Sequence, residues 1–330
     1  MLTNYLYYRI IVLKDQYNNT IVQGGYMDTI VKAEEITKSF GKQIAVRNVS
    51  MEVKKGDIYG FIGENGAGKT TMIRMMAGLA KPSSGRLSLF GSGDLVKARE
   101  KIGTVIEYPA LMPGMTAREN LMVEMKLRGL KDPKKIEEVL IKVGLADTKK
   151  KKVKNFSLGM KQRLAIAIAL LGDPEFLILD EPTNGLDPVG IREIRELIQE
   201  LNQEHHITVL ISSHILGELS KLATRYGIIH KGELIQEFTE EELNRQSQSS
   251  LTVKMPKEQR EKACRVMREQ FSAREFQMVG EEELKVYGFL EKPGKVNQAL
   301  MQEGIQVEEI FVENMDLEKY FLRAVGGAAC

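Results

Sequence analysis

The chain has 330 residues, of which 43% are hydrophobic and 28% are charged, and this length predicts about two domains with a sizeable core. This composition excludes a disordered chain, and the net charge of +2 provides no global attraction to nucleic acid, so no nucleic-acid partner is expected. Two cysteines, Cys264 and Cys330, exclude a disulfide framework and favour a reducing, cytoplasmic compartment. The apolar run at 164–171 is far shorter than the ~18–20 residues that cross a bilayer, so we expect a partner chain to provide any membrane path.

The first 26 residues differ from the rest of the chain. Five of the ten tyrosines precede Met27, and Arg9 interrupts the apolar stretch that a secretory signal needs. Codons for Gln-Gly-Gly at 23–25 can form a bacterial ribosome-binding site at the right spacing before Met27. We therefore hypothesise that 1–26 is a mis-assigned start, which detection of these residues by mass spectrometry of the native protein would exclude. The alternative is a real, flexible extension.

A glycine-rich loop follows an apolar strand pattern. The run at 58–62 indicates a buried strand, GENGAGKT occupies 63–70, and an apolar helical pattern follows at 72–76. This order leaves backbone N–H groups free to bind phosphate oxygens, whereas Lys69 provides a charge for the β- and γ-phosphates and Thr70 a hydroxyl for Mg²⁺. The alternatives are a structural glycine turn and a dinucleotide site, which lacks its third glycine here. The predicted nucleotide-binding residues of the loop are Gly63, Asn65, Gly66, Gly68, Lys69, Thr70 and Thr71.

A second apolar run, at 176–179, ends in two carboxylates. Its four apolar residues indicate a strand buried on both faces of a parallel sheet, and ligands bind at the carboxyl ends of such strands. Asp180 is thereby placed to hold Mg²⁺ through water, and Glu181 to polarise the attacking water. Without the glycine loop, the pair is equally compatible with a solvated strand end.

Three further motifs give the chain a family resemblance. NFSLGMKQR at 155–163 resembles the signature sequence of ABC transporter ATPases, EPTNGLDP at 181–188 resembles their D-loop segment, and SSH at 212–214 matches their switch histidine. The resemblance extends over about 28–240 and is strongest to the bacitracin-export and lantibiotic-immunity group. It implies an α/β fold, namely a P-loop NTPase ABC cassette at 27–243. Such a cassette combines a RecA-like core with an antiparallel β subdomain and a helical subdomain, and the helical subdomain is expected at about 108–160.

The resemblance also implies roles for residues outside the loop. In this family two cassettes close head to tail, so a homodimer is expected in which Ser157 and Gly159 cap ATP bound to the opposite copy and Asp187 contacts that copy. His214 would hold the γ-phosphate and the attacking water, the alternative being a capped strand end. Phe40 would stack on adenine, the alternative being a core aromatic. The implied partner is an integral membrane permease, which places the chain on the inner face of a bacterial cell membrane.

The sequence departs from the family pattern at three positions. Leu158 stands where glycine is common, and Met160 stands where glutamine is common. Glu107 occupies the Q-loop position, where its carboxylate can contact the nucleotide and ligate Mg²⁺ but cannot donate a hydrogen bond as an amide does. We expect this change to affect coupling to the permease rather than ATP binding.

The stretch from 108 to 153 has a helical pattern that the family resemblance assigns to the permease contact. Its methionines, at 112, 115, 122 and 125, suit an adaptable apolar surface, although core packing is the simpler interpretation for half of them. The lysines at 149–152 and 154 are interpreted as a solvated linker, with contact to lipid headgroups as the alternative.

A small α+β accessory domain is predicted at 244–330. Apolar patterns indicate strands at 251–255, 276–279, 284–289 and 307–312, with helices at 263–271, 296–301 and 317–325. This is a β-α-β-β-α-β order followed by a final helix. It contains no catalytic constellation, and dimer contact or regulation is the expected role.

These observations favour an ATP-hydrolysing subunit that drives export of a membrane-active peptide antibiotic. A soluble ABC ATPase acting on ribosomes or DNA is the alternative, but the chain contains neither a second cassette nor long heptad repeats. A regulator that has lost catalytic activity is the third alternative. The residues expected to catalyse hydrolysis are all present, which argues against it.

Overall fold

The computed structural model describes residues 29–107, 111–246, 250–271, 276–279, 283–287, 293–313 and 317–327. The predicted extension at 1–26 lies outside these residues. The chain divides into two compact units, one ending at Glu237 and one beginning at Phe238, six residues before the predicted boundary. Within the described residues, no helix is long and apolar enough to cross a membrane.

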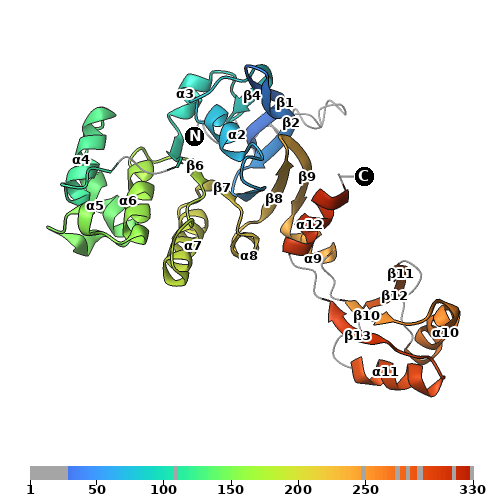
Figure 1. Cartoon of the computed structure of the whole chain (residues 1–330). Helices are drawn as coiled ribbons and strands as arrows, with labels where there is room; N and C mark the ends of the chain where they lie inside the picture. Colours follow the sequence, from blue (N-terminus) through green and yellow to red (C-terminus); the bar gives the residue numbers. More distant parts are fainter. Residues whose placement is uncertain are drawn as a thin grey trace, which may run out of the picture. The chain divides into compact units, whose positions relative to one another are not determined.

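A largely parallel sheet forms the centre of the first unit (Figure 1). Its order is β5-β6-β7-β3-β8-β9, and β3 pairs in parallel with β7 and β8, as β6 does with β5 and β7. Every residue of β3, β6 and β7 is buried, as expected for strands covered on both faces. The strands are β3 (Ile58–Ile62), β5 (Ile102–Val105), β6 (Phe176–Asp180), β7 (Thr208–Ser213), β8 (Arg225–His230) and β9 (Glu233–Thr239).

Helices follow several of these strands, and one of them begins at residues predicted to bind phosphate. The helix α2 (Lys69–Met76) starts directly after the glycine loop and buries its methionines in the core. Its C-terminal carbonyls at Met75 and Met76 accept hydrogen bonds from the Arg99 guanidinium, at the end of α3 (Leu95–Arg99). The helices α7 (Pro188–Gln203) and α8 (Leu216–Leu219) follow β6 and β7.

An antiparallel sheet of order β2-β1-β4 packs on the same core. Its strands are β1 (Thr29–Phe40), β2 (Gln43–Lys54) and β4 (Ser84–Leu89). Side chains such as Val31, Val46 and Leu89 are fully buried in one cluster with Phe176 and Leu210 of the parallel sheet. The predicted combination of a P-loop core with an antiparallel β subdomain is therefore confirmed.

The helical subdomain lies on the side of the unit away from β1, β2 and β4 (Figure 1). It contains α4 (Ala117–Leu127), α5 (Lys134–Lys142), the short helices η1 (Ala146–Thr148) and η2 (Val153–Asn155), and α6 (Leu158–Leu170). Thr116 and Glu119 form a capping box that fixes the start of α4. Of the predicted methionine surface, Met125 is buried in the core and Met112 is exposed.

The second unit has the predicted β-α-β-β-α-β order. Its antiparallel sheet runs β11-β12-β10-β13, and α10 and α11 pack on the face that carries Leu251, Val253, Leu284 and Val286. The last strand begins two residues later than predicted. The elements are α9 (Glu240–Gln246), β10 (Ser250–Lys254), η3 (Lys257–Gln259), α10 (Arg260–Phe271), β11 (Phe276–Val279), β12 (Glu283–Tyr287), α11 (Pro293–Gln302), β13 (Glu309–Glu313) and α12 (Leu317–Gly327).

A buried polar pair joins β3 to β9 in the first unit. The Tyr59 hydroxyl donates a hydrogen bond to Glu237 Oε1 at 2.7 Å, and burial raises the pKa of this hydroxyl well above its ordinary value. Burial also raises the pKa of the Glu237 carboxyl, against the smaller opposing effects of Tyr59, the Glu52 backbone and Arg225. The folded state therefore binds the Glu237 proton more tightly than the unfolded chain does.

This difference predicts a pH-dependent stability. As pH rises from the ordinary carboxyl pKa of 4.5 through the raised folded value, the unfolded chain loses its proton first and the free energy of unfolding falls. Glu237→Gln keeps an oxygen acceptor for Tyr59 but cannot ionise, so its stability relative to the wild type should increase with pH across this window. Urea denaturation followed by circular dichroism measures this in a chain without tryptophan.

Glu233→Gln provides the matched control, because Glu233 lies exposed on the same strand in an ion pair with Arg47. Its stability relative to the wild type should not increase with pH over the same range. A Glu237→Gln difference that likewise fails to increase would contradict the assignment.

Candidate active site

The glycine loop between β3 and α2 adopts backbone conformations that require glycine. Gly66 has a φ of 82° and Gly68 a φ of 110°, and a Cβ at Gly68 would lie 2.8 Å from the Ala45 carbonyl oxygen. A Cβ at Gly63 would collide with the carbonyl oxygen of Ile229. The loop thus turns tightly at the N-terminus of α2, where backbone N–H groups face an anion.

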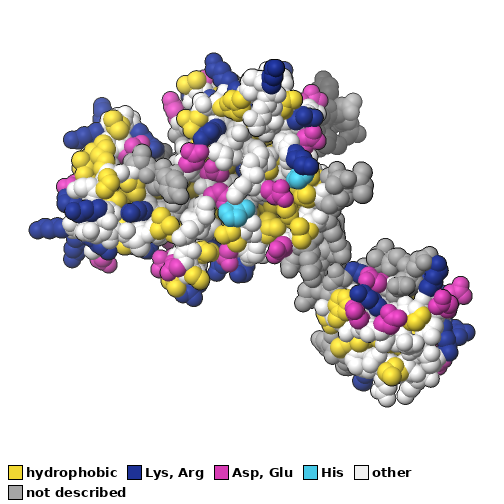
Figure 2. Space-filling view, in the orientation of Figure 1, with side chains coloured by type: hydrophobic (Ala, Val, Ile, Leu, Met, Phe, Trp, Pro, Cys, Tyr) yellow, Lys and Arg dark blue, Asp and Glu magenta, His cyan; other side chains and the backbone are white. Residues whose placement is uncertain are grey.

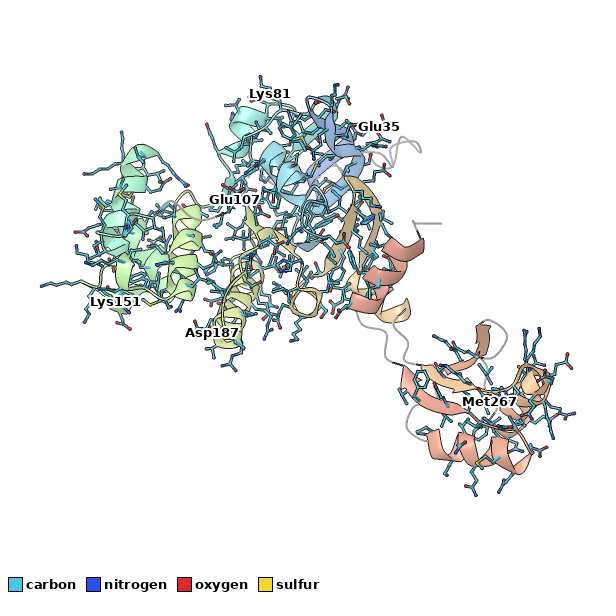
Figure 3. All side chains as sticks on the ribbon, viewed as in Figure 1. Glu35, Lys81, Glu107, Lys151, Asp187 and Met267 are labelled. Carbon is cyan, nitrogen blue, oxygen red and sulfur yellow. The ribbon has the colours of Figure 1, made fainter. Side chains whose placement is uncertain are left out.

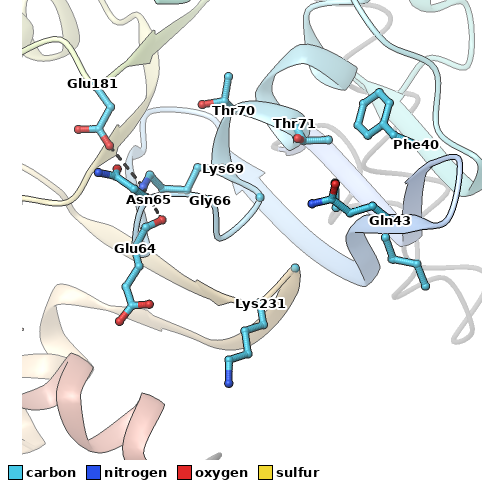
Figure 4. A pocket seen from close by; sticks show the side chains of 14 residues that line it. Phe40, Gln43, Glu64, Asn65, Gly66, Lys69, Thr70, Thr71, Glu181 and Lys231 are labelled. Carbon is cyan, nitrogen blue, oxygen red and sulfur yellow. Dashed lines mark hydrogen bonds and ion pairs between the residues drawn. The ribbon is translucent and has the colours of Figure 1, made fainter.

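Lys69 is a buried cation held across this loop. Its side chain is 5% exposed, and its Nζ donates to the carbonyl oxygens of Gly63 at 2.6 Å and Glu64 at 3.2 Å. A carboxylate oxygen of Glu181 lies 3.3 Å from the same nitrogen (Figure 4). The ammonium therefore has a counter charge supplied from β6, on the other side of β7 in the sheet.

A cavity of about 570 Å³ opens in front of the loop. Phe40 and Gln43 lie at one end, and Lys69 and Glu181 at the other (Figure 4). Phe40 is 54% exposed, with Lys38 Nζ 4.9 Å from the centre of its ring, so the alternative of a core aromatic is wrong. The predicted residues that line this cavity are Phe40, Asn65, Gly66, Gly68, Lys69, Thr70, Thr71 and Glu181.

Two neighbouring strands position the carboxylates. Asp180 is buried at the end of β6, where its Oδ1 accepts a hydrogen bond from Ser212 Oγ of β7 at 2.5 Å. The same hydroxyl accepts from the Glu181 backbone N–H at 3.0 Å. Glu181 has a φ of 51°, an unfavourable value for a non-glycine residue, and this turn of the backbone aims its side chain at Lys69 and His214.

Glu181 is bound from two sides. Its Oε2 lies 2.7 Å from His214 Nδ1, and its Oε1 faces Lys69. Among the described residues nothing donates a hydrogen bond to Oε1, although this atom is buried. A carboxylate held in place, with one oxygen engaged only by the charge of Lys69, can take a proton from a water molecule once that charge is bound by another anion.

A second cavity of about 620 Å³ adjoins the carboxylates. Thr70, Glu107, Asp180 and Glu181 line it, together with Leu158, Lys161 and Gln162 of α6. Glu107 follows β5 with a φ of 59° and forms an ion pair with Arg74 of α2 at 2.5 Å (Figure 3). Hydroxyl and carboxylate oxygens around one cavity are the donors that Mg²⁺ prefers.

The described residues contain no cluster of three or more carboxylate, histidine or cysteine side chains within metal-binding distance.

Five predicted residues line neither cavity. Gly63 and His214 still contact residues that do, Lys69 and Glu181 respectively, whereas Ser157, Gly159 and Asp187 lie apart. Ser157 is the exposed N-cap of α6, where its Oγ accepts from the Met160 N–H at 3.2 Å, and Gly159 follows in the first turn. Asp187 is the exposed N-cap of α7, where it accepts from Gly190 N–H at 3.0 Å (Figure 3). Their position outside the cavities is what a role toward a second copy requires, and that role stays a prediction.

Sequence reasoning missed several residues of the site. Ser212 was identified only as part of a motif, although its register opposite Asp180 makes it the donor to that carboxylate. Arg74 had no sequence signal as a partner of Glu107. Lys231 and Gly232, in the turn after β8, line the first cavity and are distant in sequence from every motif.

Comparison with known proteins agrees with this geometry. A family model described as ABC transporter matches residues 46–184. The bacitracin transport ATP-binding protein BcrA of Bacillus licheniformis is 44% identical over 91% of this chain and 99% of its own length. This chain belongs to the ABC transporter ATPases. BcrA of Enterococcus faecalis is 36% identical to this ABC ATPase over 91% of the chain, and the lantibiotic transport ATP-binding protein SrtF of Streptococcus pyogenes is 44% identical over 63%.

Solved structures support the same assignment. A dimeric structure of the ATP-binding cassette MJ0796 with ADP and Pi is 30% identical, with a TM-score of 0.57 over 64% of this chain and 99% of that one. The cassette cbiO1 from Clostridium perfringens is 28% identical, with a TM-score of 0.60 over 74% of this chain and 97% of that one. The predicted ATPase fold and ATP-binding activity are therefore confirmed.

The hydroxyl of Ser212 gives the first test of the site. Ser212→Ala leaves the buried Asp180 carboxylate without this donor, and hydrogen bonds to charged groups contribute about 1.5–3 kcal/mol. We expect the free energy of unfolding, measured without Mg²⁺, to fall by about this amount.

Ser213→Ala is the matched control, because Ser213 is also buried but its Oγ, among the described residues, accepts only from the neutral Ile215 N–H at 2.9 Å. It should cost about 1 kcal/mol or less. Equal losses in the two variants would show that Ser212 does not carry a charge-assisted bond.

Proposed function

We propose that this ABC ATPase drives export of a peptide antibiotic, bacitracin or a lantibiotic-like peptide, through a separate membrane permease. Two relatives that match over 91% of this chain, and so include the second unit, are named bacitracin transport ATP-binding proteins, and SrtF is named a lantibiotic transport protein. The observation that supports hydrolysis is the Lys69–Glu181–His214 arrangement, in which Lys69 and Glu181 line the first cavity and His214 holds Glu181. The chain would act on the inner face of the cell membrane.

The first cavity suits ATP along its length. The exposed ring of Phe40 offers a face for adenine, and the loop from Gly63 to Gly68 offers its N–H groups to the phosphates. Lys69 would bind the β- and γ-phosphates, and Thr70 and Asp180 would hold Mg²⁺. Bound Mg²⁺ would neutralise phosphate charge as the terminal phosphate is transferred to water.

Glu181 would act as the general base. Its Oε1 accepts no hydrogen bond from the described residues and is held only by the charge of Lys69, beside which the γ-phosphate would bind. A phosphate oxygen competes for the Lys69 ammonium, so nucleotide binding would release Oε1 to orient and deprotonate the attacking water. His214, fixed by Glu181 Oε2, would hold that water and the γ-phosphate.

The complete site would form between two copies of the chain. Ser157 and Asp187 are exposed at helix N-termini, and the positive ends of α6 and α7 attract phosphate and carboxylate groups. We propose that Ser157 and Gly159 cap ATP in the partner copy while Asp187 contacts it. Each copy would then provide the loop for one nucleotide and the cap for the other.

Glu181→Gln tests hydrolysis and transport in one variant. Removing a general base lowers a hydrolysis rate by about 10²–10⁴-fold. ATP binding should persist, and light scattering should detect an ATP-bound dimer that the wild type forms only transiently. In a sensitive bacterium that also expresses the permease, the variant should no longer raise the minimal inhibitory concentration of the transported peptide.

Glu175→Gln is the control, since Glu175 lies exposed before β6 in an ion pair with Lys101. It should keep both ATP hydrolysis and resistance. Surviving turnover in Glu181→Gln would exclude Glu181 as the base, and a wild-type chain that hydrolyses ATP but protects against neither peptide class would exclude the proposed substrate.

Glu107→Gln tests the Q-loop position. Glu107 would ligate Mg²⁺ once its ion pair with Arg74 is broken. A glutamine at this position gains a hydrogen-bond donor but loses the negative charge. We expect ATP binding to be retained and the ratio of permease-stimulated to basal hydrolysis to change. Arg74→Gln, which removes the ion pair but keeps the carboxylate, should change this ratio less; unchanged stimulation of Glu107→Gln by the reconstituted permease would contradict the proposal.

A further inference from the structure

Positive charge is concentrated in the helical subdomain. Residues 111–160 contain twelve Lys and Arg against six Asp and Glu, a net charge of +6, whereas the whole chain carries +2. The remainder of the chain therefore carries −4. Figure 2 shows Lys and Arg side chains around the outer side of this subdomain, with hydrophobic side chains between them.

The segment between η1 and α6 presents much of this charge. Lys149, Lys150, Lys151 and Lys154 are exposed, and Lys151 lies at the far side of the subdomain from the sheet (Figure 3). Within the described part of the chain, the side chains of Lys149, Lys150 and Lys154 form neither an ion pair nor a hydrogen bond. Their charge is free for a partner.

The lysine segment is fixed to the subdomain rather than loose. Val153 N–H donates to the Met115 carbonyl and Lys154 N–H to the Pro113 carbonyl, both at 2.9 Å. Val153 and Phe156 are buried beneath the segment. These contacts hold the backbone of the segment in place, which lowers the backbone entropy lost on binding.

The same subdomain exposes apolar side chains. Ile141, in the last turn of α5, is 66% exposed, and Leu127, in the last turn of α4, is 76% exposed. A subdomain that exposes both lysines and aliphatic side chains fits the surface of an anionic bilayer, where headgroup phosphates attract ammonium groups and the interface accepts apolar groups.

We propose that the helical subdomain binds anionic lipid headgroups at the membrane surface through Lys149, Lys150, Lys151 and Lys154. The inference rests on the proposed function, which brings the cassette to a membrane. It deepens that function by adding a direct contact between the cassette and lipid. This contact orients the helical subdomain toward the membrane before any permease is engaged. It is electrostatic, so it weakens as salt screens the lysines.

Sedimentation of the full chain with lipid vesicles tests the proposal. Vesicles of equal parts phosphatidylglycerol and phosphatidylcholine should bind the chain at low salt, and phosphatidylcholine vesicles should not. Each surface lysine contributes about fivefold to such binding, so the triple substitution K149Q, K150Q and K154Q should weaken it on the order of 100-fold. The triple substitution K55Q, K81Q and K97Q, at exposed lysines outside the subdomain, should leave it unchanged.

Three outcomes would overturn the proposal. The first is equal binding to both kinds of vesicle, and the second is an equal loss of binding in the two triple variants. The third is lysine-dependent binding only to phosphatidylcholine vesicles that contain the permease. That outcome would assign the lysines to an acidic protein surface. ATP hydrolysis in solution reports whether the variants are folded. Because vesicle binding needs neither ATP nor permease, failure here is distinguishable from failure of the export assay.

Discussion

The buried ammonium of Lys69 sets the geometry of the nucleotide cavity. A cation that is 5% exposed needs a counter charge, and Glu181 provides it from the end of a strand that is not the neighbour of the loop's own strand. The strand between them, β7, therefore has to end at the same edge, and its register places Ser213 opposite Ile62 and Ser212 opposite Asp180. Ser212, at the end of β7, and His214, directly after it, then hold the two carboxylates.

This arrangement also explains why the backbone at Glu181 tolerates an unfavourable conformation. A φ of 51° costs free energy in an ordinary turn, and it persists only where surrounding contacts impose it. Here the Glu181 N–H is bound by Ser212 and its side chain by Lys69 and His214. The strain is therefore maintained by the charges that nucleotide binding would rearrange, which links occupancy of the phosphate loop to the orientation of the proposed base.

The sequence allowed prediction of those parts of the site whose chemistry is local. The loop from Gly63 to Thr70 and the Asp180–Glu181 pair are each encoded by a few adjacent residues, and apolar periodicity indicated the strands beside them. The hydrogen bond of Ser212 to Asp180 joins residues 32 positions apart, and the Arg74–Glu107 pair joins residues 33 apart, so both depend on strand register and helix packing that no local pattern reports. In the second unit, periodicity gave the order of the elements, whereas the pairing β11-β12-β10-β13 required the tertiary structure.

The distribution of charge over the surface likewise cannot be predicted from the composition of the whole chain. A net charge of +2 excludes a global attraction to polyanions, but this sum combines +6 in the helical subdomain with −4 elsewhere. At physiological ionic strength the field of an exposed charge is screened within about 8 Å, so a partner responds to the lysines it touches and not to the sum over the chain. The helical subdomain is the part that contains the signature helix α6, whose N-terminus carries Ser157 and would face ATP in a second copy. A surface that orients this subdomain therefore also orients the cap of the partner's nucleotide, and contact with lipid and closure of the dimer become geometrically coupled through one rigid group of helices.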